Sequence, residues 1–155
     1  MYSLKRSVNI ILDLTIHLII SLEIFLIAYF KTGEFFYILP AILGGILIDA
    51  DHIIDYLIQV RKISFKKILI FPYKKRKNVY LFLHSWELVF LFLFLSFFYN
   101  SLFWQLFSSS WALHLLIDNI DGAKAKGFLH YFVIYRLKKG FKTEELKGFL
   151  FDQKL

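Results

Sequence analysis

Long apolar stretches separated by short polar segments run through most of this 155-residue sequence. Each stretch has about 20 residues or more, which is what a helix needs to cross the roughly 30 Å hydrocarbon core of a membrane. The pattern predicts an all-α, polytopic membrane protein in which four transmembrane helices form a four-helix bundle. The predicted spans are residues 8–30, 36–60, 79–99 and 101–121.

The first apolar stretch lies where a signal peptide would lie. It is long, however, and it contains Asp13, His17 and Glu23 with no small-residue cleavage site. We therefore interpret it as a retained helix. Residues 1–155 are predicted to form a single integral membrane domain, because this length leaves no room for a separate soluble module.

Two segments outside the spans alternate apolar and basic residues. They are the connector, residues 61–78, and the tail, residues 122–155. Such amphipathic segments are typical of helices that lie in the membrane interface. We expect both segments to lie along the lipid headgroups, with Arg136 and Lys138 contributing basic groups there. We expect His130 to be an interfacial residue and not a metal ligand.

The basic residues predict the orientation of the spans. All but one of the 19 Lys and Arg residues precede the first span, lie in the connector or follow the last span, and the exception is Lys31. Since basic loops stay on the cytosolic side of a membrane, both termini and the connector are predicted to be cytosolic. The net charge of +7 is therefore expected to face anionic lipid headgroups and not nucleic acid.

Composition excludes several kinds of protein and site. Hydrophobic residues make up 58% of the chain and aromatic residues 20%, which is too apolar for a soluble domain of this size. The chain has no cysteine, so disulfides and thiolate metal sites are excluded. Gly44 and Gly45 in the second span are expected to let helices pack closely, and not to bind phosphate.

Twelve ionisable side chains interrupt the apolar stretches, where a purely structural span would carry almost none. A charged group inside a membrane is costly and by default marks a functional site. The spans contain no Lys or Arg to neutralise the acids, so a metal cation or protons must supply the positive charge. The twelve residues are Asp13, His17, Glu23, Asp49, Asp51, His52, Asp55, His84, Glu87, His114, Asp118 and Asp121.

Helical spacing groups these residues, because positions three or four apart share a helix face. Pairs with this spacing are Asp13 with His17, Asp49 with His52, His84 with Glu87, and His114 with Asp118. Histidines and carboxylates that point inward from facing helices are how metal sites are built in helical bundles. This ligand set suits Zn²⁺, with Mn²⁺ or Fe²⁺ as alternatives, and allows one or two ions. The predicted metal ligands are His17, Asp49, His52, His84, His114 and Asp118.

The other acidic residues also have structural interpretations. Asp13 and Glu23 are explained equally well by headgroup or helix contacts and by the site. Asp55 and Asp121 lie near the predicted membrane boundary, where a solvated carboxylate costs little, and for Asp55 we favour this interpretation. Surplus carboxylates could also orient the ligating histidines.

Three short motifs follow one another in the order found in a known family. They are Gly-Gly-Ile-Leu-Ile-Asp49-Ala-Asp51-His52, His84-Ser85 and Leu113-His114-Leu-Leu-Ile-Asp118, preceded by an early histidine, His17. Over about residues 10–121 the chain resembles the YdjM-like membrane-bound metal-dependent hydrolase family. Ile48 and Leu83 stand where the family has proline and threonine, and Val79 and Tyr80 replace its His-Arg pair. The resemblance implies a metal-dependent hydrolase.

We therefore predict a metal-dependent hydrolase acting at the cytosolic face of the membrane. The metal would activate water, with Asp51 or Glu87 as general base. Basic residues of the connector would attract an anionic substrate such as a lipid phosphoester. These candidate substrate-binding residues are Lys74, Lys75, Arg76 and Lys77.

Two other functions fit the same residues. A non-catalytic membrane subunit with a structural metal would use them as a closed site. A metal-ion or proton transport protein would need polar residues across the whole membrane. The outer halves of the spans are nearly all apolar beyond Glu23, so a transport path would require a homo-oligomer. We rank the structural metal protein second and the transport protein third.

Overall fold

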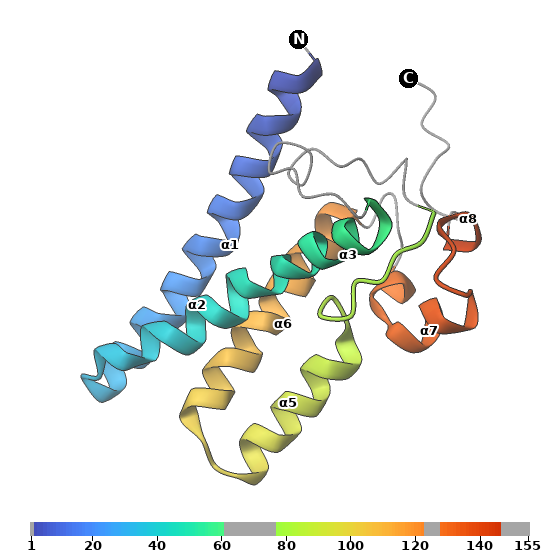
Figure 1. The fold of residues 1–155 in the computed structure, drawn as a ribbon. Coiled ribbons are helices and arrows are strands. Elements are labelled where there is room, and N and C mark those ends of the chain that lie inside the picture. The colour runs from blue at the N-terminus through green and yellow to red at the C-terminus, as the bar shows by residue number, and fades with distance from the viewer. Residues whose placement is uncertain (1, 61–76, 123–127, 147–155) are drawn as a thin grey trace. The chain divides into compact units, whose positions relative to one another are not determined.

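The computed structural model describes residues 2–60, 77–122 and 128–146. Within these residues the chain is all-α, as predicted, apart from one isolated β-bridge (Figure 1). The chain divides into two compact units, each built from two separate parts of the sequence. We call Met1–Asp49 with Leu88–His114 the first unit, and Ala50–Glu87 with Leu115–Leu155 the second unit.

The first unit is built around α1 (Tyr2–Thr32) and α2 (Ile38–Ile46), which run back along each other (Figure 1). Gly33 follows α1 in the left-handed conformation, with a φ of 74°, and its N–H donates to the Tyr29 carbonyl. Glycine takes this conformation without steric cost, so α1 can end here. The 3-10 turn η1 (Phe35–Tyr37) then leads into α2.

Gly44 and Gly45 allow α2 to pack closely against its neighbours. A Cβ on Gly44 would overlap the Phe107 carbonyl of α6 (Leu102–Gly122), and a Cβ on Gly45 would overlap the Ser21 hydroxyl of α1. Small residues at such contacts let the backbones of membrane helices approach one another. The predicted role of this glycine pair in close helix packing is therefore confirmed.

Aromatic side chains join α5 (Trp86–Phe98) to the amino-terminal part of α6. The centroid of the Phe92 ring lies 5.7 Å from the ring centroids of Trp104, Phe107 and Trp111. Ring pairs at this separation stabilise a contact beyond the apolar area that they bury. The two helices are thus joined through one ring of α5 that touches three successive turns of α6.

The second unit is assembled from short elements. Residues 77–85 form no helix. The remaining elements are α3 (Ala50–Val60), the end of α6, the 3-10 helix η4 (Phe128–Tyr131), α7 (Val133–Lys138) and α8 (Thr143–Leu146).

Backbone hydrogen bonds join residues 77–79 to the tail. The Val79 N–H donates to the Phe141 carbonyl, and the Thr143 N–H donates to the Lys77 carbonyl, both at 2.9 Å. Beside this pairing, Val79, Leu81 and Leu146 form a small buried apolar cluster. The non-helical segment therefore finds hydrogen-bond partners in other parts of the chain, as buried backbone groups must.

The second predicted span contains a short interruption of its α-helix. α2 ends at Ile46, the 3-10 turn η2 (Leu47–Asp49) follows, and α3 begins at Ala50. Two successive glycines, Gly44 and Gly45, precede the interruption and lower the intrinsic helix propensity there. Asp49 consequently lies in a tight turn between two helices.

The third predicted span is too long. α5 begins at Trp86 instead of Val79, and its 13 residues rise only about 20 Å. His84 precedes the helix, so the predicted helix face shared by His84 and Glu87 is wrong. The segment stays non-helical because its backbone groups bond to α3 and to the tail.

Among the described residues, two helical runs are long and apolar enough to cross a membrane: Leu12–Thr32 and Phe35–Val60. Only 22% and 33% of their apolar windows are buried, whereas a core helix of a soluble protein is mostly buried. α5 is a shorter apolar helix. These two helices could cross a membrane, and the four spans with cytosolic termini stay predictions.

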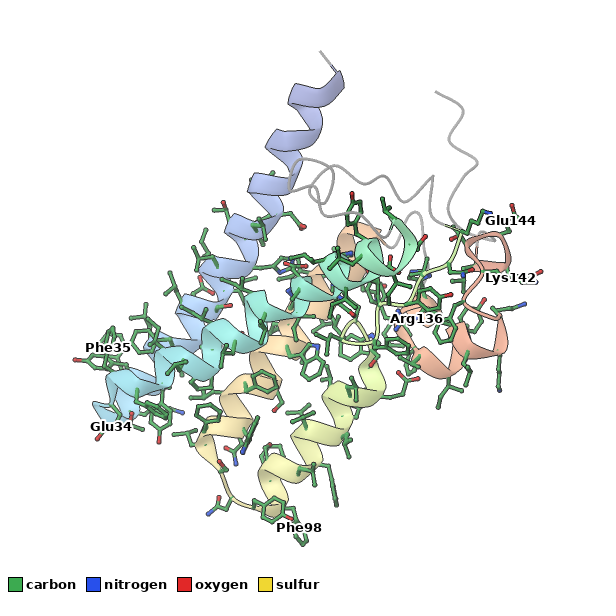
Figure 2. The ribbon with its side chains drawn as sticks, viewed as in Figure 1. Glu34, Phe35, Phe98, Arg136, Lys142 and Glu144 are labelled. Atoms are coloured by element: carbon green, nitrogen blue, oxygen red, sulfur yellow. The ribbon has the colours of Figure 1, made fainter. Side chains whose placement is uncertain are left out.

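The described part of the tail is not a simple surface anchor. Arg136 is only 1% exposed, and His130 and Tyr131 are buried as well. Figure 2 shows Arg136 among the side chains of the second unit, whereas Lys142 and Glu144 lie at its surface. The expectation that the Arg136 side chain faces the headgroups is therefore wrong, and the interfacial location of the tail and of His130 stays a prediction. Arg136 is buried because a backbone carbonyl accepts from its guanidinium.

Candidate metal centre

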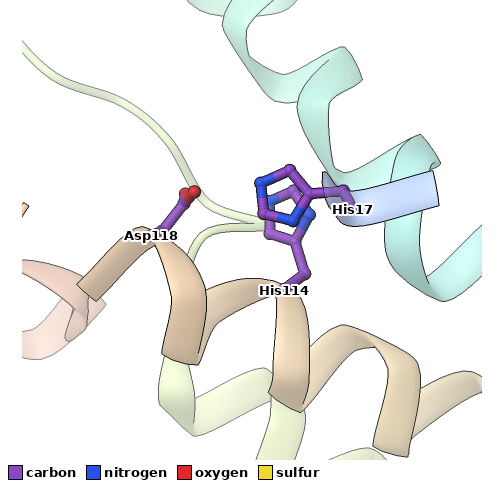
Figure 3. Close-up of side chains that lie close together, drawn as sticks. All are labelled: His17, His114 and Asp118. Carbon is purple, nitrogen blue, oxygen red and sulfur yellow. The ribbon is translucent and has the colours of Figure 1, made fainter. Parts of the chain in front are cut away.

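The first unit brings two histidines and an aspartate together. His17 lies on α1, His114 on α6, and Asp49 at the end of η2. The two imidazole rings are stacked, with 3.9 Å between centroids and 23° between planes, and both residues are buried. Figure 3 shows the stacked rings, with Asp118 one turn further along α6. We call His17, Asp49 and His114 the first-unit cluster.

The contacts of His114 fix which ring nitrogen carries the hydrogen. Its Nδ1 lies 2.8 Å from the Gly45 carbonyl oxygen. A carbonyl only accepts hydrogen bonds, so Nδ1 carries the hydrogen and donates it. In the neutral ring Nε2 then has a lone pair, and Nε2 faces Asp49 Oδ1 at 3.7 Å. Two electron-rich atoms facing each other in this way require a cation or a proton between them.

Serine hydroxyls hold the helices that carry this cluster. Ser21 donates to the His17 carbonyl at 2.7 Å, and Ser110 donates to the Ala41 carbonyl at 2.7 Å. The two hydroxyl oxygens lie 3.4 Å from each other, and both serines are buried. These contacts join α1, α2 and α6 one turn away from the histidines. At the other edge of His17, Nε2 lies 3.5 Å from Asp13 Oδ1.

The second unit holds a comparable cluster around His84. The His84 Nδ1 lies 3.6 Å from Asp51 Oδ2, and its Nε2 lies 3.5 Å from Asp118 Oδ2. The ring centroid of His52 lies 4.7 Å from that of His84. A neutral imidazole has one N–H and can donate to only one of the two carboxylates. The other nitrogen then faces a carboxylate oxygen with its lone pair, and a metal cation or a second proton is needed between the two atoms. We call Asp51, His52, His84 and Asp118 the second-unit cluster.

The backbone at His84 is held from two sides. Asp51 Oδ2 accepts hydrogen bonds from the N–H groups of Leu83 (2.6 Å) and His84 (3.3 Å). The His84 carbonyl accepts a hydrogen bond from the Arg136 guanidinium at 2.9 Å. These side chains therefore hold the backbone at His84, although residues 77–85 form no helix.

The nitrogen–oxygen distances favour a metal site over simple ion pairs. A hydrogen bond between a charged N–H and a carboxylate is usually about 2.7–2.9 Å long. Two ligands that each lie about 2.1 Å from a tetrahedral ion are roughly 3.4 Å apart. The separations of His84 Nε2 from Asp118 Oδ2 (3.5 Å) and of His114 Nε2 from Asp49 Oδ1 (3.7 Å) are closer to the second value. Buried His and Asp clusters of this chain could therefore hold a metal ion.

Each predicted metal ligand lies in one of the two clusters. His17, Asp49 and His114 lie in the first unit, and His52, His84 and Asp118 lie in the second. Glu23 is exposed on α1. Of the predicted substrate-binding residues, Lys77 is exposed. Outside the described part of the structure lie Lys74, Lys75, Arg76 and the side chain of Asp121.

The two candidate general bases, Asp51 and Glu87, both accept backbone hydrogen bonds. Glu87 Oε2 accepts from the Val133 N–H at 3.0 Å, and Oε1 accepts from the Ile134 N–H at 2.9 Å. The Glu87 carboxylate thus lies at the start of α7, where the helix dipole favours a negative charge. These contacts give both acids a structural role, and their role as bases stays a prediction.

Asp55 is buried, which corrects the expectation of a solvated carboxylate at a membrane boundary. Its Oδ1 accepts hydrogen bonds from the Tyr80 N–H at 3.1 Å and from Gln59 Nε2 at 3.0 Å. Gln59 Nε2 also donates to the Asn78 carbonyl at 2.9 Å. Asp55 therefore anchors the non-helical segment to α3.

The sequence interpretation missed four groups that shape the clusters. Ser21 and Ser110 each lie four residues from a cluster histidine, so their place on the same polar face was a usable signal. Arg136 follows Phe132 by one helical turn, which is the pattern of an interfacial helix as much as of a buried cation. The Gly45 carbonyl is a backbone group and leaves no such signal.

Comparison with known proteins gives no further assignment. No family model matches the sequence, no curated protein matches it, and no solved structure matches the fold.

Proposed function

We propose that this protein is a membrane-embedded metal-dependent hydrolase. Its proposed ligands suit Zn²⁺, and also Mn²⁺ or Fe²⁺. A bound ion of this kind polarises the scissile bond and activates water as the nucleophile. The ligands are His17, Asp49 and His114 of the first-unit cluster and His52, His84 and Asp118 of the second-unit cluster.

The orientation of His114 carries the proposal. A metal-binding histidine commonly donates its second ring N–H to a carbonyl or carboxylate, which fixes the tautomer and aims the ligating nitrogen. The His114 Nδ1 makes such a bond to Gly45, and its Nε2 is aimed at Asp49. A histidine that only filled space would gain nothing from directing a lone pair at a carboxylate.

Partial exposure of the carboxylates favours a catalytic site over a structural one. The side chains of Asp49 and Asp118 are 25% and 16% exposed, whereas those of His114 and His84 are at most 2% exposed. Structural zinc sites are closed by four protein ligands, while catalytic sites keep a position for water or substrate. We therefore rank the hydrolase above a non-catalytic subunit with a structural metal, and a transport protein third.

The contacts of Asp51 support a role in orienting His84. A carboxylate that accepts the second N–H of a ligating histidine holds the ring and raises its basicity. Asp51 Oδ2 lies 3.6 Å from His84 Nδ1 and is itself held by two backbone N–H groups. In this arrangement His84 Nε2, which lies 3.5 Å from Asp118 Oδ2, would be the nitrogen that holds the ion.

A different carboxylate is proposed to accept the proton from water. Asp51 and Glu87 are both bonded to backbone N–H groups. Asp13 lies 3.5 Å from the His17 Nε2, and its side chain is 47% exposed. A general base must lie within reach of the proton and exchange it with solvent. We assign this role to Asp13.

The proposed substrate is an anionic phosphoester, such as one in a lipid headgroup. The basic connector supports this assignment through charge attraction to anions at a membrane surface. The motif order shared with the YdjM-like family supports the reaction class, and membership of that family is part of the proposal.

Hydrolysis of phosphoesters by the purified protein in detergent tests the proposal. We expect p-nitrophenyl phosphate or short-chain phosphatidic acid to be hydrolysed when Zn²⁺ or Mn²⁺ is added. His114→Ala removes a proposed ligand and should lower the rate by about a hundredfold or more, since disturbing only the groups that orient a ligand already costs about 10- to 100-fold. Glu23→Gln, an exposed acid on α1, should leave the rate unchanged. A protein that binds metal but hydrolyses no phosphoester would favour the structural metal site instead.

A further inference from the structure

We infer that Arg136 is a positioning residue for His84. We also infer that residues 128–146 hold the segment that carries this proposed metal ligand. The inference rests on the proposed function, because it specifies how one of the proposed ligands is held. All the contacts that carry it lie within the second unit. The alternation of apolar and basic residues predicts only that this segment lies at the lipid surface.

The buried Arg136 side chain makes a specific hydrogen bond to the backbone. Among the Lys and Arg side chains that the structure describes, Arg136 is the one that is buried. A buried guanidinium is costly unless its N–H groups are taken up by acceptors. The His84 carbonyl provides one acceptor, at 2.9 Å. Since Asp51 holds the His84 N–H, the two side chains together hold the peptide groups on both sides of the His84 Cα.

A second pair of hydrogen bonds joins α7 to the segment around His84. Glu87 lies three residues after His84 and accepts from the N–H groups of Val133 and Ile134. Arg136 lies on the next turn of α7. The stretch from His84 to Glu87 is therefore fixed to α7 at both ends, by a side chain from each partner. Such reciprocal contacts set the height and rotation of the His84 ring.

The rest of the tail supports the start of the same segment. Residues 77–79 pair with residues 141–143 through two backbone hydrogen bonds. Val79 and Leu81 pack with Leu146 in a buried apolar cluster, against which Tyr135 also packs. A segment without helical hydrogen bonds depends on such partners for its conformation. The tail therefore fixes both ends of residues 77–87.

Cobalt binding by Arg136 variants tests the inference. Wild-type protein, Arg136→Gln and Arg136→Lys would be titrated with Co²⁺ while the visible absorption spectrum reports the coordination geometry. Disturbing a group that orients a ligand costs about 10- to 100-fold in metal affinity. We expect a loss of this size and an altered spectrum for Arg136→Gln, with partial recovery for Arg136→Lys. Lys138→Gln, an exposed residue of the same helix, should behave as wild type.

A second readout separates positioning from a general loss of fold. Hydrogen exchange in metal-free Arg136→Gln should rise at residues 82–87, and stay unchanged at α1 and α2. If Arg136→Gln does not fold, Glu87→Gln provides the test by weakening the second pair of hydrogen bonds, and it should lower Co²⁺ affinity as well.

The outcomes distinguish this inference from the proposed function. Co²⁺ binding by Arg136→Gln and Glu87→Gln with wild-type affinity and spectrum would overturn the positioning role while leaving the metal centre intact. Absence of Co²⁺ binding by the wild-type protein would overturn both. Wild-type binding that weakens in the two variants but not in Lys138→Gln would establish the metal centre and the positioning role, and hydrolysis would still be tested separately.

Discussion

The buried and half-buried carboxylates of this protein have two different roles. Asp49 and Asp118 face histidine nitrogens at distances that suit a shared cation. Asp55 and Glu87 accept hydrogen bonds from backbone N–H groups and so replace bonds that a helix would have provided. The distinction matters because removing the first kind should abolish metal binding, whereas removing the second should lower stability and should affect metal binding only indirectly, through the position of a ligand.

Replacement of Asp55 tests the second kind of role. Asp55→Ala leaves the Tyr80 N–H without its acceptor inside the second unit, which costs about 1–3 kcal/mol of unfolding free energy. Asp55→Asn keeps an acceptor oxygen and should cost less. Denaturant unfolding of the purified protein measures both losses. Metal content should remain that of the wild type in Asp55→Asn, and its loss there would make Asp55 part of the metal site.

Glu87→Gln separates a helix-binding role from a catalytic one. The substitution keeps one acceptor oxygen but removes the charge that interacts with the start of α7, so we expect a loss of about 1 kcal/mol in stability. Excess metal compensates for the weaker metal binding of the variant. The hydrolysis rate of metal-saturated Glu87→Gln should therefore stay close to that of the wild type. A rate that falls by a hundredfold or more in metal-saturated protein, with stability unchanged, would instead identify Glu87 as the general base.

At the scale of elements, the close approach of α1, α2 and α6 places the first-unit cluster. Gly45 is central to this arrangement because its carbonyl accepts from His114 while its missing side chain makes room for Ser21. The glycine pair thus sets both helix spacing and the tautomer of a proposed ligand. The same two residues also precede the 3-10 turn that carries Asp49.

Substitution at the glycine pair tests this geometry. Gly45→Ala should destabilise the protein by about 1–3 kcal/mol, because the new methyl group overlaps the Ser21 hydroxyl. Removing that hydroxyl in Gly45→Ala/Ser21→Ala should recover part of the loss. Gly44→Ala meets the Phe107 backbone, so Ser21→Ala should not rescue it. Thermal unfolding would compare the variants, and equal rescue of both glycine variants would contradict the packing described.

The sequence predicted the helical class, the packing glycines and the residues that gather in the clusters. These features depend on apolar periodicity, residue size and the cost of charge in apolar surroundings, all of which are local properties of the chain. It did not predict that helix α5 starts at Trp86, or that Arg136 is buried. Both depend on bonds between residues far apart in the chain, namely from Asp51 and Arg136 to the segment around His84.

At the scale of the whole molecule, exposed apolar helices suggest a lipid environment. Large apolar side chains of α1 and α5 remain exposed, including Phe30, Phe94 and Phe98. Exposed apolar surface of this extent marks a membrane or protein contact. Two helices could cross a membrane. The basic residues then predict which side of the membrane each loop occupies.

Single cysteines test the number of spans, since the natural chain has no cysteine. Cysteines at Lys5 and Lys74 should be protected from a membrane-impermeant thiol reagent added outside intact cells. Cysteines at Glu34 and Ser101 should be labelled if α5 and α6 cross the membrane as predicted. Labelling at Glu34 without labelling at Ser101 would leave two crossings and contradict the four-span topology.

Metal content tests the central claim most directly. Elemental mass spectrometry would be applied to detergent-purified wild-type protein, Asp49→Ala, His114→Ala and the exposed control Glu23→Gln. We predict about one or two Zn, Mn or Fe ions per chain in the wild type and the control, and loss of metal from the two cluster variants while they remain folded. Wild-type protein without metal, even after reconstitution, would contradict the metal centre. The facing lone pairs of His114 and Asp49 would then have to be bridged by a proton.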